Sequence, residues 1–290
     1  MLYRWPPPIS PEDTWCAYRA GASRMTEIAD RYNKSIAERV TPPPTLPDVS
    51  VTLENRLESS FCRVPHVWTA HVQNSTSPDT STATTYPTLL TAKIFDPIFI
   101  DSGDAEYADP FSLRDLSVSR EVDAYRRLEP LQGTRVPRFY GHFIAPLPSQ
   151  HNRTVNVILM EYVQGTDLRI LVPLEVAETV CSVHKDAVID AALDYFFEIL
   201  ALGVSLSDMQ PRNVVLRHQE HGTGKPHCTT ANCPLRLEVD CEDLHMVMVD
   251  FEMVEFIEPD PNFNEPLIRR QHIDRVKPVY LTRWLESRMP

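Results

Sequence analysis

Two short polar motifs late in the chain constrain its fold more than any other feature. The run Asp208-Met-Gln-Pro-Arg-Asn213 lies between an apolar helical segment and a strand-like run at 214–216. A second strand-like run, 247–249, ends in Asp250. A carboxylate placed shortly before an amide, with another carboxylate closing a strand, can position a hydroxyl nucleophile and hold Mg²⁺. The pattern therefore indicates phosphoryl-transfer chemistry, although an isolated D-x-x-x-x-N run is more often a turn.

Three upstream segments add charged and apolar groups in an order that fits this chemistry. The strand-like run 89–95 carries Lys93, and the amphipathic helical run 119–128 carries Glu121 just before its apolar face. The run 155–160 is typical of a buried strand and leads into a turn that contains glycine. Taken alone, Lys93 fits a solvated edge strand and Glu121 an ordinary surface ion pair. The ordered combination of all these elements favours a common site.

The combination resembles the protein-kinase-like superfamily, in particular its short, divergent fungal members related to aminoglycoside and choline kinases. The resemblance covers roughly residues 51–258. It implies an α+β, bilobal fold with a small antiparallel-sheet N-lobe and an abbreviated, mostly helical C-lobe. We expect an N-terminal helix and a Pro-rich linker over 1–47, the N-lobe and hinge over 48–163, and the C-lobe over 164–290.

The resemblance implies ATP and Mg²⁺ as cofactors and gives five residues a role in using them. Lys93 would contact the nucleotide phosphates, and Glu121 would hold that lysine in place. Asp208 would orient or deprotonate the acceptor hydroxyl. Asn213 and Asp250 would bind the metal, which neutralises charge on the transferring phosphoryl group together with the lysine.

The resemblance also implies a position for the rest of the nucleotide. Met160 would be the gatekeeper residue, and the backbone of Glu161 and Val163 would meet the adenine edge. The turn expected to cover the phosphates contains Ser59 and Ser60 but no glycine. Glycines let backbone amides approach phosphates closely, so a turn lined by serines is expected to grip them more weakly.

Several positions depart from the superfamily pattern. Leu206 stands where a histidine usually braces the catalytic loop, and Glu252 stands where a hinge glycine is expected. Only 40 residues follow Asp250 (290 minus 250), without a peptide-positioning segment. Two functions therefore stay open. One is an ATP- and Mg²⁺-dependent phosphotransferase acting on a protein serine or threonine or on a small hydroxyl compound; the other is a pseudokinase or scaffold with weak or no catalysis.

Helical periodicity outlines the remaining organisation. Apolar residues at helical spacing over 188–200 predict a core-packed helix that ends at Gly203, directly before the first motif. Ser10, as a capping residue, predicts an N-terminal helix that reaches about residue 40. A closing helix is expected over 279–288.

Composition narrows the class of partner. The 290 residues, 42% hydrophobic, suffice for a sizeable core. The formal net charge of −12 argues against nucleic acid or an anionic membrane as the main partner, since both require a basic face. Six scattered cysteines in so long a chain do not indicate a disulfide scaffold, and no apolar span suits a membrane. We therefore expect a reducing compartment, the cytoplasm or the nucleus.

The segment 217–237 is longer than the hairpin expected there and is rich in potential zinc ligands. These ligands are His218, His221, His227, Cys228 and Cys233. The spacing Cys228-x-x-x-x-Cys233 lacks a second matched pair, and the neighbouring glycines and proline are typical of a flexible turn. From the sequence, zinc is the less favoured interpretation of this segment.

Overall fold

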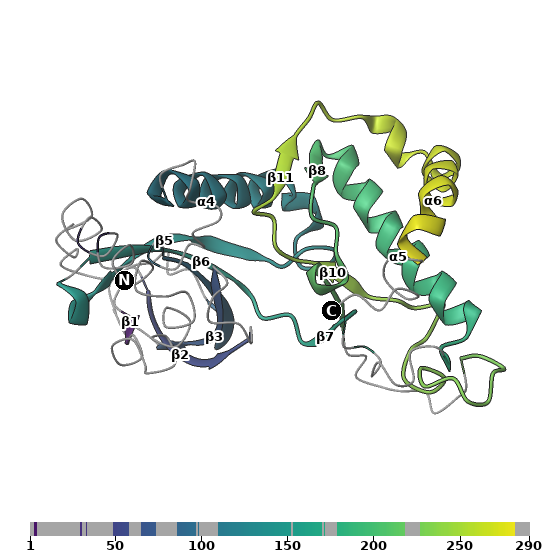
Figure 1. Cartoon of the computed structure of the whole chain (residues 1–290), viewed down its shortest axis with the longest axis horizontal. Coiled ribbons are helices and arrows are strands. Elements are labelled where there is room, and N and C mark those ends of the chain that lie inside the picture. The colour runs from purple at the N-terminus through teal and green to yellow at the C-terminus, as the bar shows by residue number, and fades with distance from the viewer. Residues whose placement is uncertain are drawn as a thin grey trace. The chain divides into compact units, whose positions relative to one another are not determined.

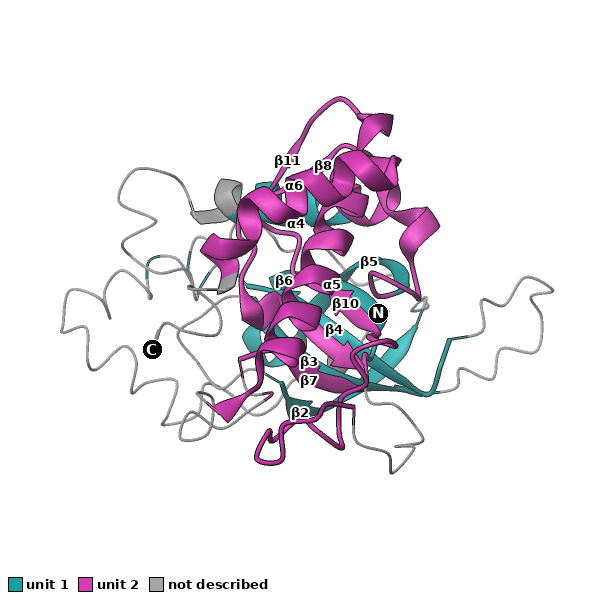
Figure 2. Ribbon diagram, turned by 90° about the vertical axis from the view of Figure 1, so that its right-hand side faces the viewer, with its two compact units in different colours: residues 1–122, 138–162 teal, residues 123–137, 163–290 magenta. Residues whose placement is uncertain are grey.

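The computed structural model describes residues 3–4, 30, 33, 49–57, 65–73, 86–96, 98, 110–151, 153–169, 171, 179–217 and 227–281. The chain forms two compact units (Figure 2). Unit 1 combines Met1–Val122 with Arg138–Tyr162, and unit 2 combines Asp123–Pro137 with Val163–Pro290. The N-terminal helix predicted from Ser10 lies outside the described residues, apart from two helical positions at 30 and 33.

Unit 1 is built on a six-stranded sheet with the order β1-β2-β3-β4-β6-β5 (Figure 1). Neighbouring strands run antiparallel, except that β1 pairs parallel with β2. The strands predicted at 89–95 and 155–160 are confirmed as β4 and β6. The bounds are β1 Tyr3–Arg4, β2 Ser50–Arg56, β3 His66–Gln73, β4 Leu89–Phe95, β5 Phe139–Leu147 and β6 Arg153–Glu161.

One face of this sheet carries the core of unit 1. Side chains two positions apart share a face of a strand, so alternate residues of β4 and β6 meet there. They are Leu90, Ala92, Ile94, Val155, Val157 and Leu159. The opposite face of β4 is covered as well, because Thr91 and Lys93 are only 7% and 3% exposed. Since β4 lies between β3 and β6, Lys93 is not on a solvated edge strand.

Helix α4 (Pro110–Arg127) contains most of the predicted helical run 119–128. Its buried side chains recur every three or four residues, as one face of a helix requires. They are Val118, Glu121, Val122, Ala124 and Tyr125. Asn156 on β6 donates a hydrogen bond to Asp115 of α4 over 3.4 Å. This part of the helix therefore lies beside the sheet of unit 1.

A buried ion pair fixes the end of β4 to the start of β6. Arg153 donates from both terminal nitrogens to Asp96, over 2.9 and 2.5 Å, and its Nε donates to Gln150 over 2.5 Å. Both charged side chains are fully buried. A planar guanidinium matches a carboxylate through two parallel bonds, so this pair sets geometry as well as charge balance. The sequence analysis did not identify it.

Unit 2 contains two long helices that pack side by side, α5 (Ser182–Ala201) and α6 (Pro266–Leu281) (Figure 1). Their apolar contact centres on Ile189, Leu193 and Phe197 of α5 and Ile273 of α6. The prediction of a core-packed helix is therefore confirmed. At its rim, Nζ of Lys277 lies 2.8 Å from a carboxylate oxygen of each of two aspartates of α5, Asp186 and Asp190.

Gly203 follows α5 and has the left-handed φ of +80° that the predicted helix end requires. A Cβ at this position would lie 2.6 Å from the carbonyl oxygen of Ile257 and 3.2 Å from Pro259. Both the backbone angle and the space therefore call for glycine.

The closing helix begins earlier than the sequence analysis predicted. It starts at Pro266 and contains Pro278. Proline is well suited to the first helical turn, but Pro278 lies inside the helix, where it lacks the N–H donor and crowds the carbonyl of Asp274. Packing of Ile273 against α5 outweighs the low helix propensity of Pro278. The expected segment beyond residue 281 lies outside the described residues.

The described part of unit 2 also contains five short strands. Strands β10, β9 and β7 form one antiparallel sheet, and β11 pairs with β8. Their bounds are β7 Gly165–Asp167, β8 Val204–Leu206, β9 Val214–Arg217, β10 Met246–Met248 and β11 Val254–Phe256. Among the described residues, the 3₁₀ helices of unit 2 are η2 Glu129–Leu131, η5 Pro211–Asn213 and η6 Pro261–Asn264, and unit 1 has η3 Pro148–Gln150.

The predicted α+β class, with an antiparallel sheet first and helices later, is confirmed. Among the described helices, none combines the length and apolar character needed to cross a membrane.

Candidate functional site

Lys93 and Glu121 form a buried ion pair in unit 1. The lysine Nζ lies 2.7 Å from Oε2 of Glu121, and the two side chains are 4% and 0% exposed. Strand β4 holds the lysine between Val67 of β3 and Ile158 of β6, and the glutamate comes from α4. Removing two charges from water is costly, and replacing such a pair by apolar side chains is often neutral or stabilising. The pair predicted from the sequence therefore forms, at a position where stability alone does not demand it.

The end of β6 is the segment predicted to meet adenine. Met160 is 5% exposed and pairs with Thr91 of β4. The backbone N–H of Glu161 donates to the carbonyl of Arg138 over 2.8 Å. An adenine contact from Glu161 would consequently use its carbonyl oxygen. Val163 follows in an extended segment before β7.

The turn predicted to cover the nucleotide phosphates, with Ser59 and Ser60, lies outside the described residues. Their role stays a prediction.

The loop between β8 and β9 holds the first motif in unit 2. The side-chain amide of Asn213 donates to the backbone oxygen of Asp208 over 2.9 Å and to its Oδ2 over 3.4 Å. Asn213 is 7% exposed, within η5. Because its nitrogen donates to Asp208, its amide oxygen is the atom with which Asn213 would bind a metal. The structure therefore brings Asp208 and Asn213 together.

Arg212 is a residue of this loop that the sequence analysis missed. Its Nη2 lies 2.6 Å from Oδ2 of Asp208, and its Nη1 donates to Gln210 over 2.6 Å. The guanidinium thus bridges two residues of the same loop and restricts the rotation of the Asp208 side chain. The signal was present in the sequence, because a cation four residues after an acid can reach it in a tight turn.

Asp250 lies two residues after β10, beside the first motif. The N–H of Val249 donates to the carbonyl oxygen of Asn213 over 2.9 Å. Asp250 has a φ of +69°, which is uncommon for a residue with a side chain. Phe251 is fully buried with its ring 5.3 Å from that of Tyr125, edge to face. A strained backbone held by well-packed neighbours is typical of functional sites.

Leu206 occupies the position where the superfamily pattern has a histidine. It pairs with Val254 in the β8–β11 ladder, and the next residue, Ser207, donates its N–H to the carbonyl of Met253 over 3.0 Å. Backbone hydrogen bonds therefore brace this loop where a histidine side chain is absent. Glu252, in place of the hinge glycine, is 8% exposed.

The predicted residues thus fall into two groups. Lys93, Glu121, Met160 and Glu161 belong to unit 1. The others belong to unit 2, and they are Val163, Asp208, Asn213 and Asp250.

No protein-family model and no curated protein matches the sequence. Solved structures do match. The kinase domain of Mycobacterium tuberculosis PknI has 16% identity and a TM-score of 0.38, over 71% of this chain and 60% of that one. A double mutant of that domain has 16% identity and a TM-score of 0.40, over 72% of this chain and 62% of that one. WaaP, in a complex with acyl carrier protein, has 14% identity and a TM-score of 0.43, over 81% of this chain and 87% of that one. This chain spans about three fifths of the PknI kinase-domain chains.

The architecture described above agrees with the fold class predicted from the sequence. An antiparallel sheet carries a buried lysine paired with a helix glutamate, and a mostly helical unit carries an aspartate–asparagine loop followed by a strand and a second aspartate. The fold of this chain is protein-kinase-like.

Proposed function

We propose that this chain is an ATP- and Mg²⁺-dependent phosphotransferase that transfers the γ-phosphate to a hydroxyl acceptor. The observation that carries the proposal is the constellation in unit 2, where Asn213 holds Asp208 through its side chain and the strand before Asp250 through its backbone. The buried Lys93–Glu121 pair in unit 1 supports it, because a buried ion pair is weak evidence of stability and better evidence of a selected role.

The donor atoms present suit the proposed cofactors. Mg²⁺ takes oxygen ligands, and the Asp250 carboxylate and the Asn213 amide oxygen are of that type. When bound, Mg²⁺ supplies positive charge that offsets the charge of the phosphates. Lys93, whose Nζ is held 2.7 Å from Oε2 of Glu121, would place positive charge beside the phosphates.

Asp208 would act on the acceptor. Its carboxylate would accept a hydrogen bond from the acceptor hydroxyl, orient the oxygen toward the phosphoryl group and take the proton as the new bond forms. Arg212 and Asn213 would keep the carboxylate in one orientation, since both contact Oδ2. Orientation of this kind is a large part of catalysis in phosphoryl transfer.

The second candidate function is a pseudokinase or scaffold. One observation favours it: Oδ2 of Asp208 lies in an ion pair with Arg212 at 2.6 Å, so an acceptor must share that carboxylate. Leu206 in place of the usual histidine and Glu252 in place of the usual glycine also favour this second candidate.

The proposal is tested by titrating the full chain with ATP in a calorimeter, with Mg²⁺ and then with excess chelator. We expect binding only with the metal, and a marked loss of affinity for Asp250→Asn. The same protein is then incubated with ATP labelled on the γ-phosphate and a panel of small hydroxyl compounds and generic protein substrates. Binding without transfer to any acceptor favours the pseudokinase, and no binding at millimolar ATP contradicts the phosphotransferase and favours a scaffold.

Arg212→Ala separates the two candidates further. If Arg212 positions Asp208, transfer falls while the KM for ATP is unchanged. If Arg212 blocks Asp208, the variant transfers faster than the parent.

A further inference from the structure

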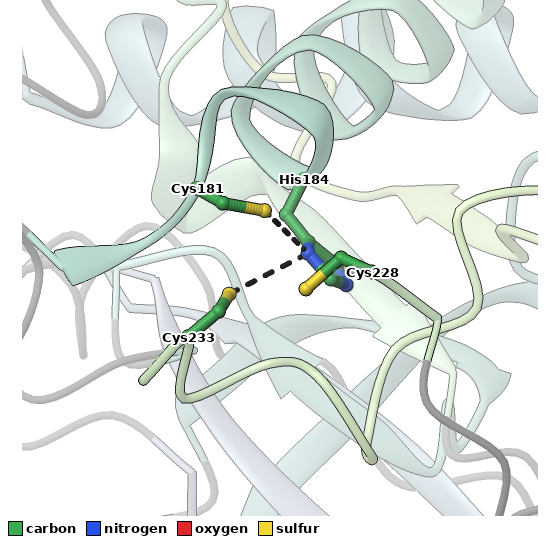
Figure 3. A group of neighbouring side chains, drawn as sticks. All are labelled: Cys181, His184, Cys228 and Cys233. Carbon is green, nitrogen blue, oxygen red and sulfur yellow. Dashed lines mark hydrogen bonds between the residues drawn. The ribbon is translucent and has the colours of Figure 1, made fainter. Parts of the chain in front are cut away.

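Four side chains from two distant segments of unit 2 converge. They are Cys181, His184, Cys228 and Cys233, and their ligand atoms all lie within 4.8 Å of one another (Figure 3). From His184 Nδ1, the sulfur of Cys181 is 3.1 Å away and that of Cys233 is 3.5 Å away. Zn–S bonds of about 2.3 Å and Zn–N bonds of about 2.0 Å in a tetrahedron put ligand atoms roughly 3.5–3.8 Å apart. The group therefore has nearly the dimensions of a zinc site.

We infer that these four residues form a structural zinc site. Three thiolates and one imidazole are the ligand set that zinc prefers, in a number that completes tetrahedral coordination. With four protein ligands no position is left for water or substrate, so the site would stabilise the fold and take no part in transfer. The inference is independent of the proposed phosphotransferase activity.

The hydrogen bonds of His184 support a metal. Its Nε2 lies 3.0 Å from the carbonyl oxygen of Val239, and a carbonyl can only accept, so Nε2 carries the proton. In the neutral imidazole, the form that binds metals, Nδ1 then presents a lone pair toward the sulfurs of Cys181 and Cys233. Two thiols cannot both donate well to one lone pair, whereas a metal ion at the centre satisfies the nitrogen and all the sulfurs. A backbone acceptor behind a histidine ligand is the usual arrangement at zinc sites.

The backbone that carries the four ligands has regular structure or hydrogen-bonded turns. Cys181 is the N-cap residue of α5 but its side chain makes no capping hydrogen bond, and His184 lies in the first turn. Together they form a C-x-x-H pair. Cys233 closes a turn through its N–H to the carbonyl of Thr230 over 3.2 Å, and the N–H of His227 donates to the carbonyl of Arg236 over 2.8 Å. The second pair therefore sits in an ordered loop.

An apolar cluster surrounds the group. Cys233 is buried with Val180, Leu235 and Val239, and Cys181 and Cys228 pack against them. Such a shell excludes water and strengthens metal–thiolate bonding. A zinc ion here would fasten the loop that begins at residue 227 to the start of α5, and unit 2 would gain a cross-link that its short strands do not provide.

The test is the metal content of the full chain purified without added metal, measured by inductively coupled plasma mass spectrometry and native mass spectrometry. We expect one zinc ion per chain, lost in Cys181→Ser and in Cys233→Ser. Cys241→Ser and His227→Ala are matched controls and should keep the metal. Cys241 lies outside the group, and Nδ1 of His227 lies 3.5 Å from a carboxylate oxygen of Asp240.

Two measurements on the unaltered sequence guard against variants that fail to fold. Refolding with Co²⁺ should give the visible bands of tetrahedral cobalt and a thiolate charge-transfer band. Chelation of zinc should lower the melting temperature by at least about 10 °C, since structural zinc contributes several kcal/mol to folding. A folded chain without metal, a mass lower by two hydrogens from a disulfide among these cysteines, or equal zinc content in all four variants would overturn the inference.

Discussion

Single side chains of the catalytic loop are restrained by more than one partner. Oδ2 of Asp208 contacts both Arg212 and Asn213, and Arg212 also reaches Gln210. Arg212 and Asn213 lie within five residues of Asp208, so the loop fixes the orientation of its own carboxylate. In unit 1, by contrast, the partner of Lys93 is 28 residues away in a helix. The Asp208 loop and the Lys93–Glu121 pair therefore require different experiments.

Asp208→Asn should keep ATP binding and remove turnover, because only the carboxylate can accept the hydroxyl proton. We expect the affinity for Mg²⁺-ATP to change by less than about twofold and the transfer rate to fall by about 10²–10⁴-fold. Calorimetry and a labelled-phosphate assay check the two parts. Asp243→Asn, at an exposed residue paired with His245, is the matched control. Unchanged turnover of Asp208→Asn would show that this loop is not catalytic.

Lys93→Met should unfold more easily than the parent by about 3–5 kcal/mol, because it leaves the fully buried Glu121 without its cation. Adding Glu121→Leu should restore most of that stability, since two apolar groups can replace a buried pair. ATP affinity should stay low in both variants. Denaturant unfolding and calorimetry measure the two quantities. A double variant that regains ATP binding would contradict a phosphate-binding role for Lys93.

Among the elements of unit 2, the junction between α5 and β8 sets the start of the catalytic loop. The helix ends at Ala201, Gly203 reverses the chain, and β8 runs directly into Ser207. Arg127 donates to the carbonyl of Gly203 over 3.4 Å, and Ile257 donates its N–H to the same oxygen over 3.0 Å. A substitution at Gly203 would therefore alter the position of the catalytic loop that follows β8.

Gly203→Ala should lower the free energy of unfolding by about 1–3 kcal/mol, since it adds strain at a left-handed φ and a contact of 2.6 Å with the Ile257 carbonyl. Gly203→Asn is the informative companion. Asparagine tolerates the backbone angle but has the same Cβ, so it should destabilise the chain almost as much. If asparagine restores full stability in thermal and denaturant unfolding, the close approach to Ile257 is not limiting.

The α5–α6 pair should show a pH dependence at its rim. Burial would lower the pKa of Lys277, but hydrogen bonds and charge attraction to Asp186 and Asp190 outweigh it, and the pKa is raised above 10.5. A raised lysine pKa means that the contribution is fully present below pH 10.5 and is lost as pH rises through the folded-state value. The difference in unfolding free energy between parent and Lys277→Met, on the order of 1 kcal/mol, should therefore shrink above pH 10.5. A constant difference up to pH 12 would contradict this assignment.

For the molecule as a whole, the sequence predicted what local periodicity encodes. Alternating apolar residues located β4 and β6, and fixed spacings located the Asp208 loop and Asp250. Pairings between distant segments could not be predicted in this way. The Asp96–Arg153 pair spans 57 residues, and Cys181 and His184 meet Cys228 and Cys233 across more than 40 residues of sequence. For α6, tertiary packing overrode the local signal of Pro278.

Net charge gives a prediction at the same scale. With a formal charge of −12, the chain should attract cationic acceptors such as amino alcohols. The KM for such an acceptor should rise several-fold as ionic strength goes from about 0.01 M to about 0.15 M, because the screening length falls from about 30 Å to about 8 Å. A neutral alcohol of similar size serves as the control. Equal salt dependence of the two KM values would remove charge steering as a basis for acceptor choice.

The left-handed backbone of Asp250 affects how this position can be probed by mutagenesis. Alanine scanning would confound two effects here, since alanine removes the carboxylate and also tolerates a φ of +69° poorly. Glycine would relieve the strain while deleting the side chain. Asparagine accepts the same backbone angle and differs from aspartate mainly in charge, so the Asp250→Asn and Asp250→Gly pair separates electrostatics from conformation at this residue.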